Sequence, residues 1–252
     1  MANQALAEIG ALMNPSMPVP NSNPKYTLRY KFAWRWEALR CWARYALIGR
    51  YRSVSGLVDF IHGNHFFKAI QIPSELRALG EILAQLRPAR ALEIGTAHGG
   101  TLLFLTRLAS PQATIVSIDL PGGKFGGGYS SRCKWFYQRF ARRKQCLHLF
   151  RGDSHSNEML DRVKAAFEGH PLDYLFIDGD HRYDGVKSDF EMYGPMVRKG
   201  GLIAFHDIVD GSSEFVGGVP DFWREIKPRY RYVEFVKDPR QGGFGIGVLY
   251  VG

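Results

Sequence analysis

Ala91-Leu-Glu-Ile-Gly-Thr-Ala-His-Gly-Gly-Thr101 is the stretch that decides the fold of this chain of 252 residues. The apolar run from Arg90 to Ile94 predicts a short buried strand, and small residues follow it. An apolar-periodic segment then predicts a helix that carries Leu102, Leu103, Leu105 and Leu108. The stretch therefore predicts a strand, a tight turn and a helix, the unit from which α/β domains are built.

The turn has the spacing Glu93-x-Gly95-x-Ala97-x-Gly99, which bears on the ligand that it holds. In the dinucleotide fingerprint G-x-G-x-x-G, the second glycine lets the backbone approach a pyrophosphate, but here Ala97 occupies that position and an acid precedes the turn. A carboxylate favours a cationic group over a phosphate because opposite charges attract. S-adenosylmethionine carries an ammonium and a sulfonium, and Asp119, which ends the next apolar run, is spaced to bind its ribose hydroxyls.

These motifs resemble the class I S-adenosylmethionine-dependent methyltransferases. The detailed similarity is to the bacterial small-molecule O-methyltransferases that share features with macrocin and catechol O-methyltransferases. The resemblance covers residues 70 to 252 and rests on five motifs in order: Glu93 to Gly100, Ile118-Asp119, Arg151-Gly-Asp-Ser154, Phe176-Ile-Asp-Gly-Asp-His181 and Ala204-Phe-His-Asp207. It implies that S-adenosylmethionine is bound by Glu93, Gly95, Thr96, Ala97, Gly99, Asp119, Asp153, Ser154 and Asp178.

Strand and helix signals alternate along this part of the chain, which is typical of a doubly wound parallel sheet. The last two strand runs are separated only by residues 238 to 243, so we expect them to pair as an antiparallel hairpin. The resemblance implies the same ending. We predict an α/β, Rossmann-like, seven-stranded and mostly parallel sheet with an antiparallel last strand, helices on both faces and an N-terminal helical extension. The predicted strands are 90–94, 113–119, 147–151, 172–178, 200–205, 230–237 and 244–250.

Two acids follow neighbouring predicted strands: Asp178 ends the fourth, and His206-Asp207 ends the fifth. Acids that meet at one sheet edge repel each other unless a cation or a proton lies between them. In the catechol-like enzymes these positions bind magnesium, and a lysine three residues after the first acid is the base. Here His181 stands in that place, and a histidine ligand such as His206 suits manganese, iron or zinc better than magnesium. The resemblance thus implies Asp178, His181 and His206 as catalytic residues, and Asp178, His206 and Asp207 as ligands of a divalent metal (Mg or Mn).

A second interpretation of this site stays open. His206 can instead hydrogen-bond Asp178 and order the sheet edge, because a neutral imidazole beside a carboxylate commonly does so. The enzyme would then be a metal-independent methyltransferase with a histidine base.

The glycine-rich loop over residues 121–128 is predicted to be a mobile turn or a substrate-ordered flap, and it lacks the spacing of a phosphate-binding loop.

The basic charge is concentrated near the N-terminus. Of the formal net charge of +9, residues 25–52 carry +7 and all other residues together +2. We expect residues 1–69 to form a linker and a basic aromatic helical extension, and residues 70–252 to form the S-adenosylmethionine-binding methyltransferase domain. A lid or dimer contact is our first interpretation of the aromatic helix, which we predict over residues 30–48. Peripheral membrane contact through residues 25–52 is the second, and nucleic-acid binding is the third.

Composition and motifs narrow the function further. Three cysteines far apart and the lack of a leader-like or membrane-spanning apolar run predict a cytoplasmic protein. Methyltransferases that act on amino groups of nucleic acid or protein resemble one another in an Asn/Asp-Pro-Pro segment, where this chain has Asp178-Gly-Asp-His181. We therefore expect a small-molecule or sugar hydroxyl as acceptor, and a homo-oligomer. A non-catalytic, membrane-associated S-adenosylmethionine-binding protein and a dehydrogenase are the alternatives from other classes.

Overall fold

The computed structural model describes residues 53–63, 67–121, 128–129 and 131–252. Contacts between residues divide the chain into two compact units, Met1–Arg50 and Tyr51–Gly252, and every element given below lies in the second. The aromatic helix predicted over residues 30–48 and the centre of the glycine-rich loop lie outside the described residues, so both stay predictions. None of the helices in the described part of the chain has the length and apolar content that crossing a bilayer requires.

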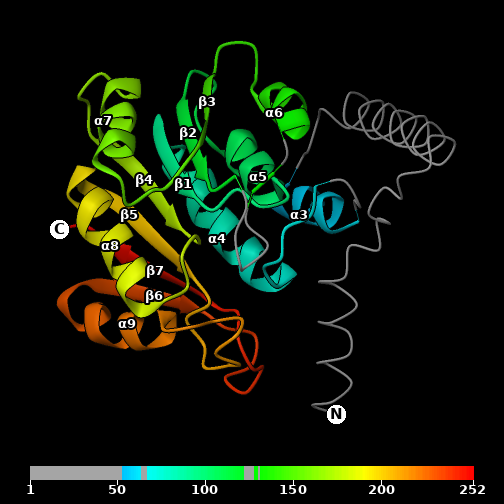
Figure 1. Cartoon of the computed structure of the whole chain (residues 1–252). Helices are drawn as coiled ribbons and strands as arrows, with labels where there is room; N and C mark the ends of the chain where they lie inside the picture. The colour runs from blue at the N-terminus through cyan, green and yellow to red at the C-terminus, as the bar shows by residue number, and fades with distance from the viewer. Residues whose placement is uncertain (1–52, 64–66, 122–127, 130) are drawn as a thin grey trace, which may run out of the picture. The chain divides into compact units, whose positions relative to one another are not determined.

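A seven-stranded sheet forms the centre of the second unit, with the strand order β3-β2-β1-β4-β5-β7-β6 (Figure 1). Strands β1 to β5 are parallel, and β7 runs antiparallel to both β5 and β6. This arrangement confirms the predicted fold class and the terminal hairpin. The strands are β1 Arg90–Ile94, β2 Thr114–Asp119, β3 Cys146–Arg151, β4 Leu172–Ile177, β5 Val197–His206, β6 Arg231–Phe235 and β7 Ile246–Tyr250.

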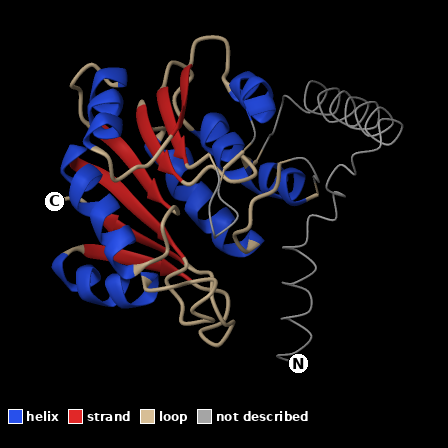
Figure 2. Ribbon diagram, viewed as in Figure 1, coloured by secondary structure: helices blue, strands red, loops and turns tan. Residues whose placement is uncertain are grey.

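Helices cover both faces of the sheet and make a three-layered unit (Figure 2). Leu92 and Ile94 of β1 belong to the core that α7, α8 and α9 share with the sheet, whereas Glu93 between them faces α4 and α5. This alternation follows from the pleat, which points successive side chains to opposite faces. The helices are α3 Val54–His62, α4 Pro73–Leu86, α5 Gly100–Leu108, α6 Ser131–Tyr137, α7 Asn157–Ala166, α8 Tyr183–Tyr193 and α9 Val219–Ile226.

Helix α3 was not predicted, and it lies inside the range assigned to the N-terminal extension. Its apolar residues Val54, Leu57, Val58 and Ile61 are buried, and the helix packs on α4 and α5. Ser53 caps it, because the Ser53 hydroxyl accepts a hydrogen bond from the Gly56 N–H at 3.1 Å. The signal was present in the sequence, since a serine followed by apolar residues at helical spacing predicts a capped amphipathic helix.

Glu75 joins α4, the helix directly before β1, to the last hairpin. Its carboxylate is 2% exposed and accepts hydrogen bonds from Lys237 N at 3.1 Å, Gln241 Nε2 at 2.8 Å and Gly245 N at 3.0 Å. A buried carboxylate is tolerated only when such donors replace water. The loop between β6 and β7 is therefore held against α4.

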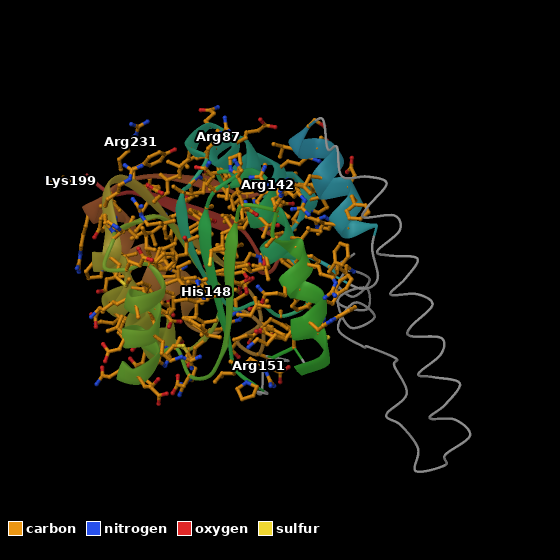
Figure 3. All side chains as sticks on the ribbon, turned by 90° about the horizontal axis from the view of Figure 1, so that it is seen from above. Arg87, Arg142, His148, Arg151, Lys199 and Arg231 are labelled. Carbon is orange, nitrogen blue, oxygen red and sulfur yellow. The ribbon has the colours of Figure 1, made fainter. Side chains whose placement is uncertain are left out.

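The strand order reverses between β1 and β4, because the chain steps outward from β1 through β2 to β3 and then returns to the other side of β1. Ligands of open α/β sheets bind outside the carboxyl ends of the strands at such a point. Figure 3 shows Arg87, Arg142, Lys199 and Arg231 toward the opposite ends of the parallel strands. The edge at the switch point is lined by acids and imidazoles instead.

Candidate active site

The turn after β1 requires glycine at its first position. Gly95 has φ +96°, and a Cβ atom there would lie 2.0 Å from the backbone oxygen of Asp178 at the end of β4. The Gly95 N–H donates to the Ile118 carbonyl oxygen at 2.9 Å. The turn therefore lies against the ends of two neighbouring strands, and a side chain at residue 95 would separate them.

Asp119 faces the turn from the end of β2. Its Oδ2 accepts a hydrogen bond from the Ala97 N–H at 2.7 Å, and Ala97 has φ +42°. Burial raises the pKa of Asp119 above its ordinary value, although backbone N–H groups that include that of Ala97 oppose the shift. Asp119, the residue predicted to bind the cofactor's ribose, is thus held beside the glycine turn. Its contact with the cofactor stays a prediction.

Glu93 is 1% exposed and lies beneath the turn, on the α4 and α5 side of the sheet. Its Oε2 accepts a hydrogen bond from the Ser117 hydroxyl at 2.6 Å, and Thr96 Oγ1 lies 2.6 Å from Ser117 Oγ. Two hydroxyls therefore link Glu93 to the turn. Burial raises the pKa of Glu93 from 4.5 to about 8. Its predicted contact with the cofactor stays a prediction.

The free energy of unfolding should fall as the pH rises because of Glu93. The unfolded chain loses this proton near pH 4.5 and the folded protein near pH 8, so the stabilisation by the bound proton is complete below 4.5 and is lost as the pH rises through about 8. The loss is on the order of 5 kcal/mol. Glu93→Gln keeps an acceptor for Ser117, so urea unfolding at pH 5, 6.5 and 8 should show a flatter profile and greater stability than wild type at pH 8. Parallel profiles for the two proteins would contradict this result.

The loop after β3 is held by helix α8. Asp153 is exposed, and its Oδ1 accepts a hydrogen bond from the His155 N–H at 2.9 Å. Ser154 is buried, and its carbonyl oxygen accepts from the Tyr193 hydroxyl at 2.6 Å. His155 Nε2 also lies 3.2 Å from Oδ1 of the buried Asp189. The motif gave no sign of Asp189 or Tyr193, because both come from a helix more than thirty residues later in the chain.

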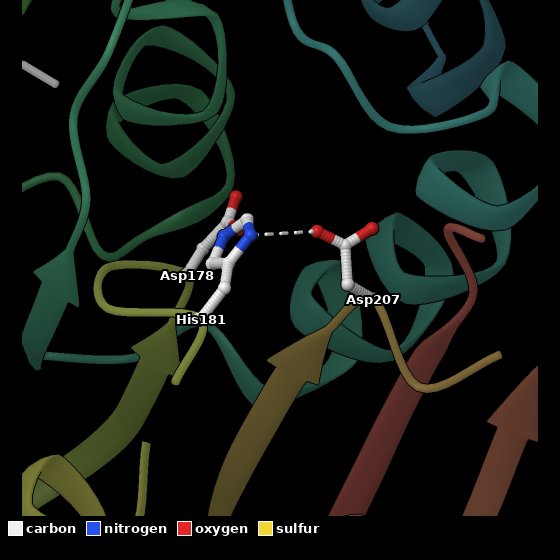
Figure 4. A group of neighbouring side chains, drawn as sticks. All are labelled: Asp178, His181 and Asp207. Carbon is white, nitrogen blue, oxygen red and sulfur yellow. Dashed lines mark ion pairs between the residues drawn. The ribbon is translucent and has the colours of Figure 1, made fainter. Parts of the chain in front are cut away.

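Asp178, His181 and Asp207 meet at the ends of β4 and β5 (Figure 4). One potential ligand atom from each lies within 4.8 Å of the others. His181 Nε2 is 3.5 Å from Asp178 Oδ1, and His181 Nδ1 is 3.5 Å from Asp207 Oδ2. The structure thus brings together two acids and the predicted base.

His206 lies between the same two carboxylates. Its Nδ1 is 3.1 Å from Asp178 Oδ1 and 3.3 Å from Asp207 Oδ2, while its Nε2 is buried and has no hydrogen-bond partner among the described residues. This is the contact expected if His206 orders the sheet edge, and it also presents Nδ1 to a cation held by the acids. The described residues therefore offer two imidazoles to one pair of carboxylates.

Opposite charges shift the pKa values of this cluster strongly. Burial alone would raise the pKa of Asp178, but the charge of His206 and the hydrogen bonds from both imidazoles lower it to about 2. Burial alone would lower the pKa of His181, but Asp178 and Asp207 raise it to about 9. The pKa of His206 is likewise raised, since both acids outweigh its burial. The acids therefore stay ionised, and their negative charge keeps the imidazoles protonated.

The segment from Gly211 to Pro220 lies against His181. His181 Nδ1 donates to the Phe215 carbonyl oxygen, and the Gly218 N–H donates to the His181 carbonyl oxygen at 2.7 Å. Gly217 has φ +55°, and a Cβ atom there would lie 2.1 Å from the His181 oxygen. This backbone contact orients the imidazole.

Gln71 is a site residue that the motifs missed. It is 3% exposed, and its Nε2 donates to Asp178 Oδ2 at 2.7 Å. The only signal is a polar residue within the apolar run Ala69-Ile70-Gln71-Ile72 before the helix. Buried polar side chains in such runs usually have a specific partner.

Comparison with known proteins identifies the domain. Residues 92–208 match the family described as a methyltransferase domain. The uncharacterized protein y4gI of Sinorhizobium fredii is 28% identical over 166 residues, which cover 64% of this chain and 17% of that protein. The chain spans less than a fifth of the length of the curated relatives that it matches.

Two solved structures share the fold. The O-methyltransferase of Bacillus cereus, in complex with SAH, superposes with a TM-score of 0.55 at 18% sequence identity. The match covers 81% of this chain and 93% of the Bacillus cereus chain. The MycE methyltransferase of the mycinamycin pathway, in complex with Mg and SAH, has a TM-score of 0.51 at 17% identity, over 81% of this chain and 55% of its own. Residues 92–208 therefore match a methyltransferase domain, and the chain has the fold of these two methyltransferases.

Proposed function

We propose that this chain transfers a methyl group from S-adenosylmethionine to a hydroxyl oxygen of a small molecule or sugar, assisted by a divalent cation. The observation that carries the proposal is the cluster of Asp178, His181, His206 and Asp207 beside the glycine turn, at the switch point of the sheet. Acyl or phosphoryl transfer would need other groups, whereas this cluster suits removal of a proton from a hydroxyl. The fold neighbours that bind SAH and Mg support the same interpretation.

The cofactor would lie across the carboxyl ends of β1, β2 and β4. Asp119, which lies beside the turn, would accept hydrogen bonds from ribose hydroxyls, and Asp153 and Ser154 from the β3 loop would contact the adenine. Gly95, Thr96, Ala97 and Gly99 bring the backbone of the turn close to the ligand. The cofactor supplies a methyl group on a sulfonium, and the protein aligns the acceptor oxygen with it.

The donor set fits a divalent cation. Asp178 and Asp207 offer carboxylate oxygens, and His206 Nδ1 lies within 3.3 Å of both acids. Two carboxylates with an imidazole suit manganese or magnesium, and a cation there would lower the pKa of an acceptor hydroxyl. It would also take over the negative charge that holds the proton on His181, so the imidazole would be free to act as a base.

His181 would take the hydroxyl proton at Nε2. Its Nδ1–H donates to the Phe215 carbonyl oxygen, and that bond fixes the tautomer in which Nε2 carries the lone pair. Asp178 Oδ1, 3.5 Å from Nε2, would then stabilise the imidazolium that forms. The metal-independent alternative keeps His181 as base and leaves His206 as an ordering residue.

The N-terminal residues and the setting of the enzyme belong to the same proposal. Residues 1–69 would serve as the extension of the domain over 70–252, with residues 25–52 as a lid, a dimer contact or a peripheral membrane contact, and the enzyme would be a homo-oligomer. The exposed free thiol of Cys146 suits the reducing cytoplasm. The alternative of a non-catalytic, membrane-associated binding protein predicts cofactor binding without turnover.

The test is calorimetry with SAH, followed by transfer of a labelled methyl group to a panel of phenols, sugars and amines, with EDTA and with Mn²⁺ or Mg²⁺ added back. We expect SAH binding, an O-methylated product, and activity that EDTA abolishes and Mn²⁺ restores. A folded protein that does not bind SAH overturns the proposal, and an N-methylated product overturns the choice of hydroxyl. Full activity in EDTA removes the cation.

A further inference from the structure

The side-chain amide of Gln71 uses its nitrogen in a hydrogen bond but leaves its oxygen without a partner among the described residues. Its Nε2 donates to Asp178 Oδ2 at 2.7 Å, but Oε1 is buried and accepts no hydrogen bond from any residue that the structure describes. An unsatisfied buried oxygen is costly, so native proteins rarely keep one without a hydrogen-bond partner. The carbonyl end of Gln71 therefore needs a donor that the described residues do not supply.

The orientation of the amide follows from its partner. A carboxylate only accepts hydrogen bonds, so Nε2 must face Asp178 and Oε1 must face away from it. The backbone is held from helix α3, because His62 Nε2 lies 2.8 Å from the Gln71 carbonyl oxygen. The unused oxygen is thus fixed in both direction and position.

Asp178 separates Gln71 from the catalytic imidazoles. Its Oδ2 contacts Gln71, whereas Oδ1 contacts His181 and His206. The acceptor hydroxyl must lie on the side of the imidazoles if His181 is to take its proton. The donor for Gln71 therefore belongs to the other ligand, the cofactor.

The neighbours of Gln71 point to the amino-acid end of that cofactor. The segment before it lies against the start of α5, since a Cβ atom on Gly100 would be 2.2 Å from Ala69 N and 2.4 Å from the carbonyl carbon of Lys68. The N-terminus of α5 has no side-chain cap, so its N–H groups suit a carboxylate. The ribose ligand Asp119 lies at the end of β2, on the far side of β1 from β4.

We propose that Gln71 Oε1 accepts a hydrogen bond from the α-ammonium group of S-adenosylmethionine, and that Gln71 is thereby a binding residue for the cofactor's amino-acid end. The inference rests on the proposed function. An ammonium carries three N–H donors and no acceptor, which matches a carbonyl oxygen beside an ionised carboxylate.

The test is a double-mutant cycle between protein and ligand. The ligands are SAH and its analogue without the α-amino group, 5′-deoxy-5′-(3-carboxypropylthio)adenosine, and the protein variant is Gln71→Met, which keeps the length of the side chain. We expect wild type to bind the analogue about 10- to 100-fold more weakly than SAH, as a charge-assisted hydrogen bond implies. In Gln71→Met, SAH affinity should fall by about 10-fold and the preference for SAH should shrink by the same factor.

Several controls keep the outcomes separate. Gln112→Met, at an exposed position, should leave both affinities unchanged. Gln71→Asn, which retracts the amide by one methylene, should reduce the preference if Gln71→Met does not fold. An unchanged preference for SAH in the Gln71 variants overturns the inference, as does intact SAH affinity with slowed methyl transfer, which would assign the donor to the acceptor hydroxyl. Absence of SAH binding to wild type would instead overturn the proposed function.

Discussion

Gly95→Ala should weaken SAH binding by on the order of 10²-fold and lower the free energy of unfolding by about 2 to 5 kcal/mol. The new methyl group would lie 2.0 Å from the Asp178 carbonyl oxygen, a distance at which backbone must move. At φ +96° an L-residue also carries backbone strain. A shift of the turn by about 1 Å would misplace the cofactor and cost on the order of 10²-fold in affinity. Urea unfolding and calorimetry measure the two effects.

Gly169→Ala is the matched control for this change. Gly169 also has a positive φ of +73°, but no heavy atom lies within 4 Å of the position that its Cβ would take. Its free energy of unfolding should fall only by the backbone strain that alanine introduces, about 1 to 2 kcal/mol, and it should bind SAH normally. If Gly95→Ala behaved like this control in both measurements, the close contact between the turn and β4 would not matter for the cofactor.

His181→Ala should slow methyl transfer by ~10² to 10⁴, the usual contribution of a general base, while leaving SAH affinity unchanged. The rate should recover in part at high pH, where the acceptor hydroxyl ionises without help. His170→Ala, at an exposed position, is the control and should keep the wild-type rate. The measurement is the initial rate of labelled methyl transfer between pH 7 and pH 10 on the acceptor found in the panel.

The same variant distinguishes two ways of using the cluster. If Asp178, His206 and Asp207 hold the cation, His181→Ala should keep Mn²⁺ affinity, whereas Asp207→Asn should lose it. If His181 is itself the third ligand, as the group in Figure 4 would allow, His181→Ala should lose Mn²⁺ affinity together with activity. A wild-type rate in His181→Ala would remove this residue from the chemistry altogether.

The strands and the acids at their ends were predictable because the signals are local. A buried parallel strand is a short apolar run, and a motif acid lies at or next to the end of three of them: Glu93 in β1, Asp119 in β2 and Asp178 directly after β4. Partners that come from distant elements were not predictable. Gln71 contacts Asp178 across 107 residues of sequence, and no periodicity marks such a pair. The burial of Glu93 was not predictable for the same reason. The sequence suggests only that this acid faces the ligand in the turn, and its burial depends on α4 and α5, which pack over it.

The hydrogen bonds from the β6–β7 loop to Glu75 have a consequence for folding during synthesis. On the ribosome, α4 emerges some 160 residues before Lys237, Gln241 and Gly245, the donors that its buried carboxylate needs. Until they have been synthesised, Glu75 is better placed in water than in a core, and α4 cannot dock fully on the sheet. The layer that covers Glu93 must therefore close late, so the nascent chain exposes that apolar face for most of its synthesis. Such a chain would depend on chaperones until its terminal hairpin forms.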